Sequence, residues 1–120
     1  MQLHYLIFDF TDEDTGAGSF DAMASALPAR LPALISETEG VLQWARREFG
    51  DPSPAEDGGQ WDFELQATGE HDTALEVSCD LQRGRVSLPQ GTGGRVTLSL
   101  TLSGSRMFCE AFSQAFPDPD

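Results

Sequence analysis

The segment 96–102 constrains the fold most strongly, because its side chains alternate strictly between apolar and hydroxyl-bearing residues. A period of two is typical of a β-strand with one buried face and one solvated face. The chain therefore builds part of its core against one side of a sheet, and the other side meets water. The apolar positions are Val96, Leu98, Leu100 and Leu102, and the hydroxyl positions are Thr97, Ser99 and Thr101.

Further segments predict the other strands of this sheet. Residues 20–26, 61–67 and 75–81 repeat the alternation, with apolar side chains at every second position. Residues 3–10 are apolar and aromatic without clear alternation, which predicts a strand with both faces partly covered. A short apolar patch at 86–88 predicts a further strand stub. The acid- and glycine-rich bend between the first two strands predicts a hairpin.

Two segments carry a helical period instead. Residues 28–49 predict a helix whose prolines lie near its start and which ends at Gly50, although the capping-box spacing of Ser36 and Glu39 allows a later start. Residues 103–105 offer a cap for a second helix, with a buried aromatic stripe. The apolar stripes contain Leu31, Leu34, Ile35, Leu42, Ala45 and Phe49 in the first helix, and Phe108, Ala111, Phe112, Ala115 and Phe116 in the second.

The order of elements predicts the fold class. Strand runs joined by short turns favour antiparallel pairing, and one apolar face per strand requires a helical cover on that side. We expect an α+β two-layer sandwich of order β-β-α-β-β-(β)-β-α, with a mainly antiparallel sheet of about five strands and two helices on one face. Residues 1–116 form a single domain in this prediction, and residues 117–120 an acidic flexible tail.

The charge balance restricts the partners. The chain has 20 acidic residues and 7 basic ones, all of them arginine, for a net charge of −13. Such a field repels nucleic acids and anionic membrane surfaces and attracts basic proteins. No apolar run approaches a membrane span, and two cysteines give weak support for a disulfide framework, so we expect a cytoplasmic protein with reduced thiols. Arginine-only base usage together with frequent alanine, glycine and proline indicates a bacterial genome of high GC content.

Carboxylates gather on the solvated side of the predicted sheet. If the strands 61–67 and 75–81 pair, Asp62, Glu64, Glu76 and Asp80 project from the same side. Like charges on adjacent strands cost stability, and a cationic partner offsets that cost. The leading hypothesis is therefore a small non-catalytic interaction module, inhibitor-like or immunity-like, that binds a basic protein through this acidic face. A solvated face that serves solubility alone, and a carboxylate pair acting as general acid and base, stay open as alternatives.

The acids of the first hairpin raise the question of a metal site. Asp12, Glu13 and Asp14 offer carboxylates for a weak divalent-cation site at residues 12–16. Calcium-loop spacing fails from Asp12 onward, because Gly16 lies at the fifth position and Met23 at the twelfth. Residues 16–21 begin like the dinucleotide-binding pattern G-x-G-x-x-G, but they lack its last glycine. A solvated turn is the simpler interpretation.

A small enzyme or ligand binder is the second functional class. A pocket between sheet and helices would draw polar groups from Tyr5 and Asp9 together with the carboxylates of the sheet. Cysteine catalysis would need Cys79 or Cys109 to meet one of the two histidines in space. The sequence predicts no cofactor. It leaves a monomer and a homodimer open, since an exposed sheet edge can pair with a second copy.

Overall fold

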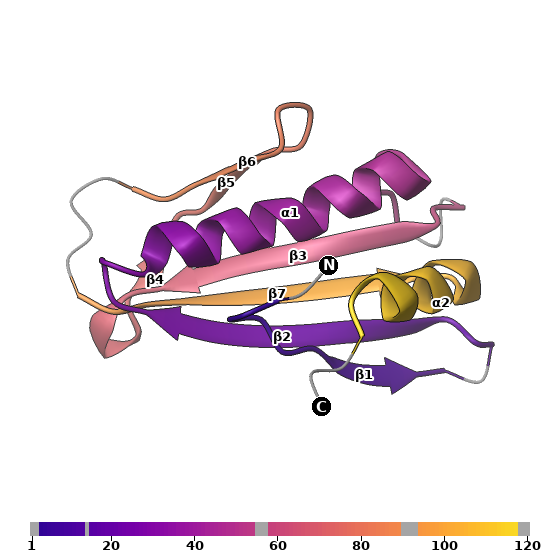
Figure 1. The fold of residues 1–120 in the computed structure, drawn as a ribbon, viewed down its shortest axis with the longest axis horizontal. Coiled ribbons are helices and arrows are strands. Elements are labelled where there is room, and N and C mark those ends of the chain that lie inside the picture. The colour runs from indigo at the N-terminus through magenta and orange to yellow at the C-terminus, as the bar shows by residue number, and fades with distance from the viewer. Residues whose placement is uncertain (1–2, 14, 55–57, 90–93, 118–120) are drawn as a thin grey trace.

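Five antiparallel strands form the main sheet, in the order β1-β2-β7-β3-β4 (Figure 1). The computed structural model describes residues 3–13, 15–54, 58–89 and 94–117. The strands of this sheet are β1 (Asp9–Asp12), β2 (Gly18–Ala26), β3 (Trp61–Thr68), β4 (Ala74–Leu75) and β7 (Val96–Gly104). The helices are α1 (Leu31–Phe49) and α2 (Arg106–Ala115), and a 3₁₀ turn spans Glu70–Asp72.

The strand β7 lies at the centre of the main sheet and pairs with both β2 and β3. Its alternation is resolved as predicted, because all four apolar side chains are fully buried while the hydroxyl side chains stay partly accessible. The neighbouring strand β2 alternates in the same way, with Phe20 and the alanines at 22, 24 and 26 buried. The sheet therefore has one face in the core and one face in solvent.

Both helices pack on the core face of the main sheet (Figure 1), which confirms the predicted α+β sandwich. The helix α1 begins at Leu31 with a proline in its first turn, so the alternative start near Ser36 is wrong. The helix α2 begins after Ser105, whose Oγ accepts the N–H of Phe108 at 3.2 Å. The apolar stripes of the two helices and the inner side chains of the sheet form one core.

A separate two-stranded hairpin, β5 (Ser78–Asp80) and β6 (Arg85–Ser87), packs against α1 (Figure 1). A carboxylate oxygen of Glu39 accepts the N–H of Val86 at 2.8 Å, and the Nε2 of Gln43 donates to the carbonyl of Gly84 at 2.8 Å. The single strand predicted over residues 75–81 is therefore wrong. Only β4, at its start, belongs to the main sheet, and β5 belongs to the hairpin.

The residues before β1 form a strap across the helices rather than a strand. We call residues 3–8 the N-terminal strap. The carboxylate of Glu37 on α1 accepts the backbone N–H groups of His4, Tyr5 and Leu6. Leu6 is buried in the core, and the ring of Phe8 meets Phe112 edge-on at 5.1 Å between centroids. The predicted strand over residues 3–10 is thus corrected to Asp9–Asp12, because the backbone of the strap bonds to a side chain and not to a neighbouring strand.

The described part of the chain holds no helix that is both long and apolar enough to cross a membrane. The predicted acidic tail begins at Pro117, which is exposed, and its remaining residues, 118–120, lie outside the described residues.

Candidate functional site: the open face of the main sheet

The solvent side of the main sheet gathers the polar side chains of four strands, and we call it the open face. On β2 and β7 these residues alternate with buried neighbours, so the alternation of the sequence places them there. Hydroxyl groups and carboxylates dominate this surface. The open face consists of Asp9 and Thr11 on β1, Ser19, Asp21, Met23 and Ser25 on β2, Thr97, Ser99, Thr101 and Ser103 on β7, and Asp62, Glu64, Gln66 and Thr68 on β3.

Three carboxylates lie in one row across the open face. Asp9 is the register partner of Asp21, Asp21 is the partner of Thr101, and Thr101 is the partner of Glu64. We call these four residues the acidic row. Directly opposed side chains on paired strands have Cβ atoms about 4.5–5.5 Å apart. The row therefore sets like charges beside each other, and Asp62 adds a fourth carboxylate in the next row, where it aligns with Ser103.

Hydrogen bonds within the open face hold several of these side chains in place. The hydroxyl of Thr101 donates to a carboxylate oxygen of Asp21 at 2.7 Å. The amide of Gln66 donates to Glu64 at 3.4 Å, a long contact that leaves the second oxygen of Glu64 available. These hydrogen bonds fix the orientation of Asp21 and link Glu64 to its neighbour on the same strand.

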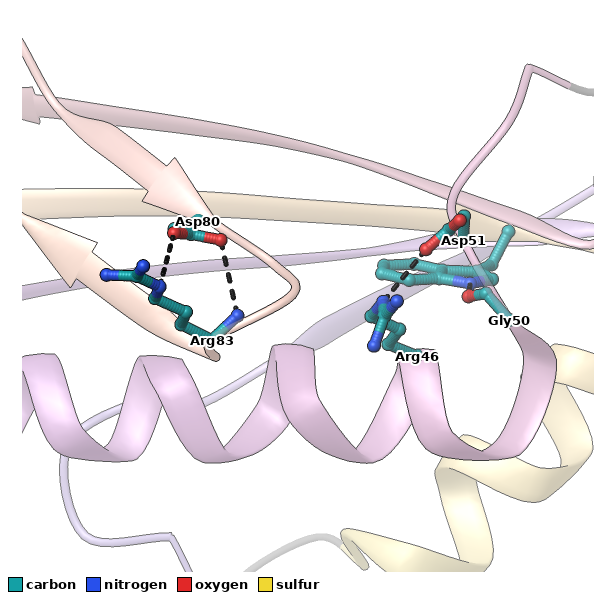
Figure 2. Close-up of polar contacts among 6 residues, drawn as sticks. Arg46, Gly50, Asp51, Asp80 and Arg83 are labelled. Atoms are coloured by element: carbon teal, nitrogen blue, oxygen red, sulfur yellow. Dashed lines mark hydrogen bonds and ion pairs between the residues drawn. The ribbon is translucent and has the colours of Figure 1, made fainter.

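The open face, as defined by its residues, contains no basic side chain. No strand of the main sheet contains an arginine, a lysine or a histidine. Two ion pairs occur among the described residues, and Figure 2 shows both: Arg46 with Asp51 at 2.8 Å beyond the end of α1, and Arg83 with Asp80 at 3.7 Å in the β5–β6 turn. The indole N–H of Trp61 donates to the carbonyl of Gly50 at 2.9 Å. Both of these ion pairs lie outside the main sheet.

The structure brings together only part of the acidic face predicted from the sequence. Asp62 and Glu64 lie on the open face as expected. Glu76 lies between β4 and β5, and Asp80 lies on the hairpin, where it also accepts the N–H of Arg83 at 3.2 Å. The expectation that these four acids share one face is wrong, because the strand that was to carry the last two leaves the main sheet after residue 75.

The other two carboxylates of the acidic row, Asp9 and Asp21, were not predicted as part of the acidic face. Asp21 lies between two buried positions of β2, so the alternation of that segment was a sufficient signal to place it on the open face. Asp9 carried no such signal, because the apolar run before it belongs to the strap. Its position follows from the β1–β2 register, which the sequence does not reveal.

The first hairpin is confirmed as a turn between paired strands. The N–H of Glu13 donates to the carbonyl of Ala17 at 2.8 Å, and the N–H of Gly16 donates to the carbonyl of Glu13 at 3.0 Å. Gly16 has a φ of 90°, a backbone conformation that glycine adopts without strain. Of the three candidate metal ligands, Asp12 and Glu13 are exposed, and Asp14 lies outside the described residues. The described residues contain no group of three or more histidine, cysteine or acidic side chains suited to a metal ion, and the cation site stays a prediction.

The residues of the enzyme hypothesis are distributed over several elements. Tyr5 is partly buried in the strap, whereas Asp9 points to the solvent side of the sheet. Cys79 is on the hairpin, Cys109 is on α2, His4 is on the strap, and His71 is in the exposed 3₁₀ turn. Both cysteines are free thiols. An enzyme based on these groups stays a prediction.

The two thiols are expected to react at very different rates. Cys109 is a buried residue of α2, whereas Cys79 is exposed on β5. Burial raises the pKa of the Cys109 thiol, and partial desolvation raises the pKa of Cys79 as well, so access rather than ionisation separates them. We expect Ellman's reagent to modify the exposed thiol of Cys79 at least about tenfold faster than the buried thiol of Cys109 in the native protein. Cys79→Ser should remove the fast phase and Cys109→Ser should leave it unchanged; the reverse pattern would contradict this fold.

Comparison of the chain with protein-family models, with curated proteins and with solved structures finds no match.

Proposed function

We propose that this protein is a non-catalytic interaction module whose open face binds a basic protein. The observation that carries the proposal is the acidic row, which lies on a main sheet without a single basic side chain. An inhibitor-like or immunity-like role, in which the module covers a basic surface of its partner, is the specific form we favour. The free thiols and the arginine-only base composition support a bacterial cytoplasmic setting for this role.

The energetic reason lies in the neighbouring carboxylates. Asp9 and Asp21 oppose each other on paired strands, and like charges in that position destabilise the sheet. A partner's arginine or lysine side chains would relieve this repulsion on binding. Guanidinium groups suit the site especially well, because they bind carboxylates with two parallel hydrogen bonds. The flat rows of hydroxyl groups beside the carboxylates supply further donors and acceptors.

The test compares three forms of the protein as immobilised baits in extracts of the cells that make it. The open-face variant is Asp21→Asn with Glu64→Gln. The matched control is Glu48→Gln with Glu76→Gln, which removes the same number of charges from exposed positions outside the open face. We expect the wild type and the control to retain one basic protein that the open-face variant loses. The Kd for the purified pair should rise about tenfold or more in the open-face variant, which corresponds to about 1.4 kcal/mol.

Ionic strength provides the second arm of this experiment. Exposed charges are screened over roughly 10 Å at ~0.1 M salt and roughly 3 Å at ~1 M salt, so binding should weaken strongly between these conditions. Equal loss of affinity in the open-face variant and in the matched control would show that net charge alone attracts the partner. Affinity that is unchanged in the open-face variant would contradict the proposed function.

A further inference from the structure

Among the residues that the structure describes, no strand pairs with the outer edge of β1. This strand is the terminal one in the sheet order, and all four of its residues are exposed. The N–H of Glu13 donates to the carbonyl of Ala17 at the turn. Hydrogen-bonded and non-hydrogen-bonded pairs alternate along an antiparallel ladder, so the pairs Asp12–Gly18 and Phe10–Phe20 are non-hydrogen-bonded. The N–H and C=O groups of Phe10 and Asp12 therefore point away from β2. This edge presents backbone donors and acceptors in the spacing that an added strand requires.

A shallow groove follows the same edge on the helix side of the sheet. It lies between β1 and α2, is open to solvent, and has a volume of about 410 Å³. The ring of Phe10 contacts Phe20 at 4.7 Å between centroids, yet the residue is 48% exposed. The side chains that line the groove include Phe10, Asp12, Arg106, Cys109, Glu110 and Gln114. An added strand would therefore place alternate side chains against the exposed ring and the others beside Asp9 on the open face.

The charge of β1 decides which strand fits its edge. The strand contains two carboxylates and no basic side chain. Pairing with β1 of a second copy would set four carboxylates on adjacent strands of two molecules, each with a net charge of −13, and like charges in such positions are destabilising. A strand with arginine or lysine beside Asp9 reverses the sign of this interaction. Charge therefore disfavours self-pairing and favours a basic partner.

We propose that β1 accepts an extended segment of a basic partner as an additional strand of the main sheet. The segment would alternate basic and apolar side chains. The basic side chains would lie beside Asp9, at the end of the acidic row, and the apolar side chains would cover Phe10 in the groove. This inference rests on the proposed function, because the basic side chains are those that the open face attracts. It adds a backbone-to-backbone contact, which a purely electrostatic contact with the open face does not require.

Amide hydrogen exchange tests this inference directly. The probe is an end-blocked heptapeptide of alternating arginine and valine, and the control peptide replaces each valine with proline. Both peptides carry the same charge, but the control cannot donate backbone hydrogen bonds at its proline positions. We expect the arginine–valine peptide to slow exchange at the amides of Phe10 and Asp12 by about tenfold or more, and the control to leave both amides unprotected. Equal effects of the two peptides, or no protection at these amides, would overturn the inference.

Two variants at one position separate the backbone contact from charge. Asp12→Pro removes an outward-pointing N–H and a carboxylate, whereas Asp12→Asn removes the charge alone. We expect Asp12→Pro to lower affinity for the arginine–valine peptide by about tenfold or more relative to Asp12→Asn. Equal affinities would contradict strand addition, even if both variants bind. If edge protection persists while Asp21→Asn with Glu64→Gln has no effect on affinity, the strand addition stands and the role of the open face fails.

Discussion

Replacing Phe112 with alanine is expected to lower the free energy of unfolding by about 3–5 kcal/mol, the largest effect of any substitution considered. Phe112 is 1% exposed and lies where α2, β2, α1 and the strap converge. Its ring centroid is 4.3 Å from Phe20, 5.1 Å from Phe8 and 5.8 Å from Trp44. Truncation would leave a cavity bordered by elements from four parts of the chain, which cannot all move inward to fill it.

Urea denaturation followed by fluorescence of the two tryptophans measures this effect. Met107→Ala on the same helix is the control, because Met107 is 66% exposed and its truncation should change the free energy of unfolding by less than about 0.5 kcal/mol. Similar losses in the two variants would show that α2 does not pack through Phe112, and the described core would then be wrong.

Replacing Glu37 with alanine is expected to lower the free energy of unfolding by about 1.5–3 kcal/mol, the second largest effect. The carboxylate is the acceptor for three consecutive backbone N–H groups of the strap, and hydrogen bonds to charged groups are stronger than neutral ones. Loss of the acceptor leaves these N–H groups unpaired or hydrated. Because the side chain of Leu6 is buried in the core, release of the strap also exposes apolar surface.

Hydrogen exchange at Tyr5 and Leu6 measures the release of the strap, and urea denaturation measures the cost to the whole domain. Glu48→Ala is the matched control, since Glu48 is an exposed glutamate of the same helix that makes no described hydrogen bond to the strap. The account predicts fast exchange at both amides in Glu37→Ala and slow exchange in the control. Slow exchange in both variants would contradict the tether.

The elements that the sequence predicted well are those in which one face packs against a single layer of the fold and the opposite face meets solvent. The strands β2, β3 and β7 each alternate over most of their length, because one face meets the helices and the other meets solvent. The stripe predicted for α1 includes the buried Leu34, Leu42 and Ala45, although it omits Val41, which is buried as well. In these segments local pattern and burial depend on the same two-sided environment, so the pattern alone was sufficient.

The segment 75–81 shows where that reasoning fails. Of the apolar positions in its alternation, Leu75, Val77 and Leu81 are partly buried, whereas Cys79 is exposed. Periodicity does not reveal which layer the apolar face meets. Here the last part of the segment joins a hairpin that α1 holds through Glu39 and Gln43, contacts that lie more than 40 residues away in sequence.

The acidic row shows the same division. Glu64 and Asp21 could be placed on the solvent side from alternation alone. Their alignment in one row depends on the β2–β7–β3 register, and the contribution of Asp9 depends on a strand that starts six residues later than the apolar run suggests. The tether of the strap to Glu37 determines that start, and no local pattern encodes it.

The measurement that tests the central claim most directly is an NMR titration of the ¹⁵N-labelled protein with the basic protein that it retains. The account predicts that amide shifts and line broadening concentrate at the acidic row and at β1, disappear in Asp21→Asn with Glu64→Gln, and persist in Glu48→Gln with Glu76→Gln. Shifts concentrated on α1, α2 or the β5–β6 hairpin, with the acidic row unchanged, would contradict the claim that the open face is the binding surface.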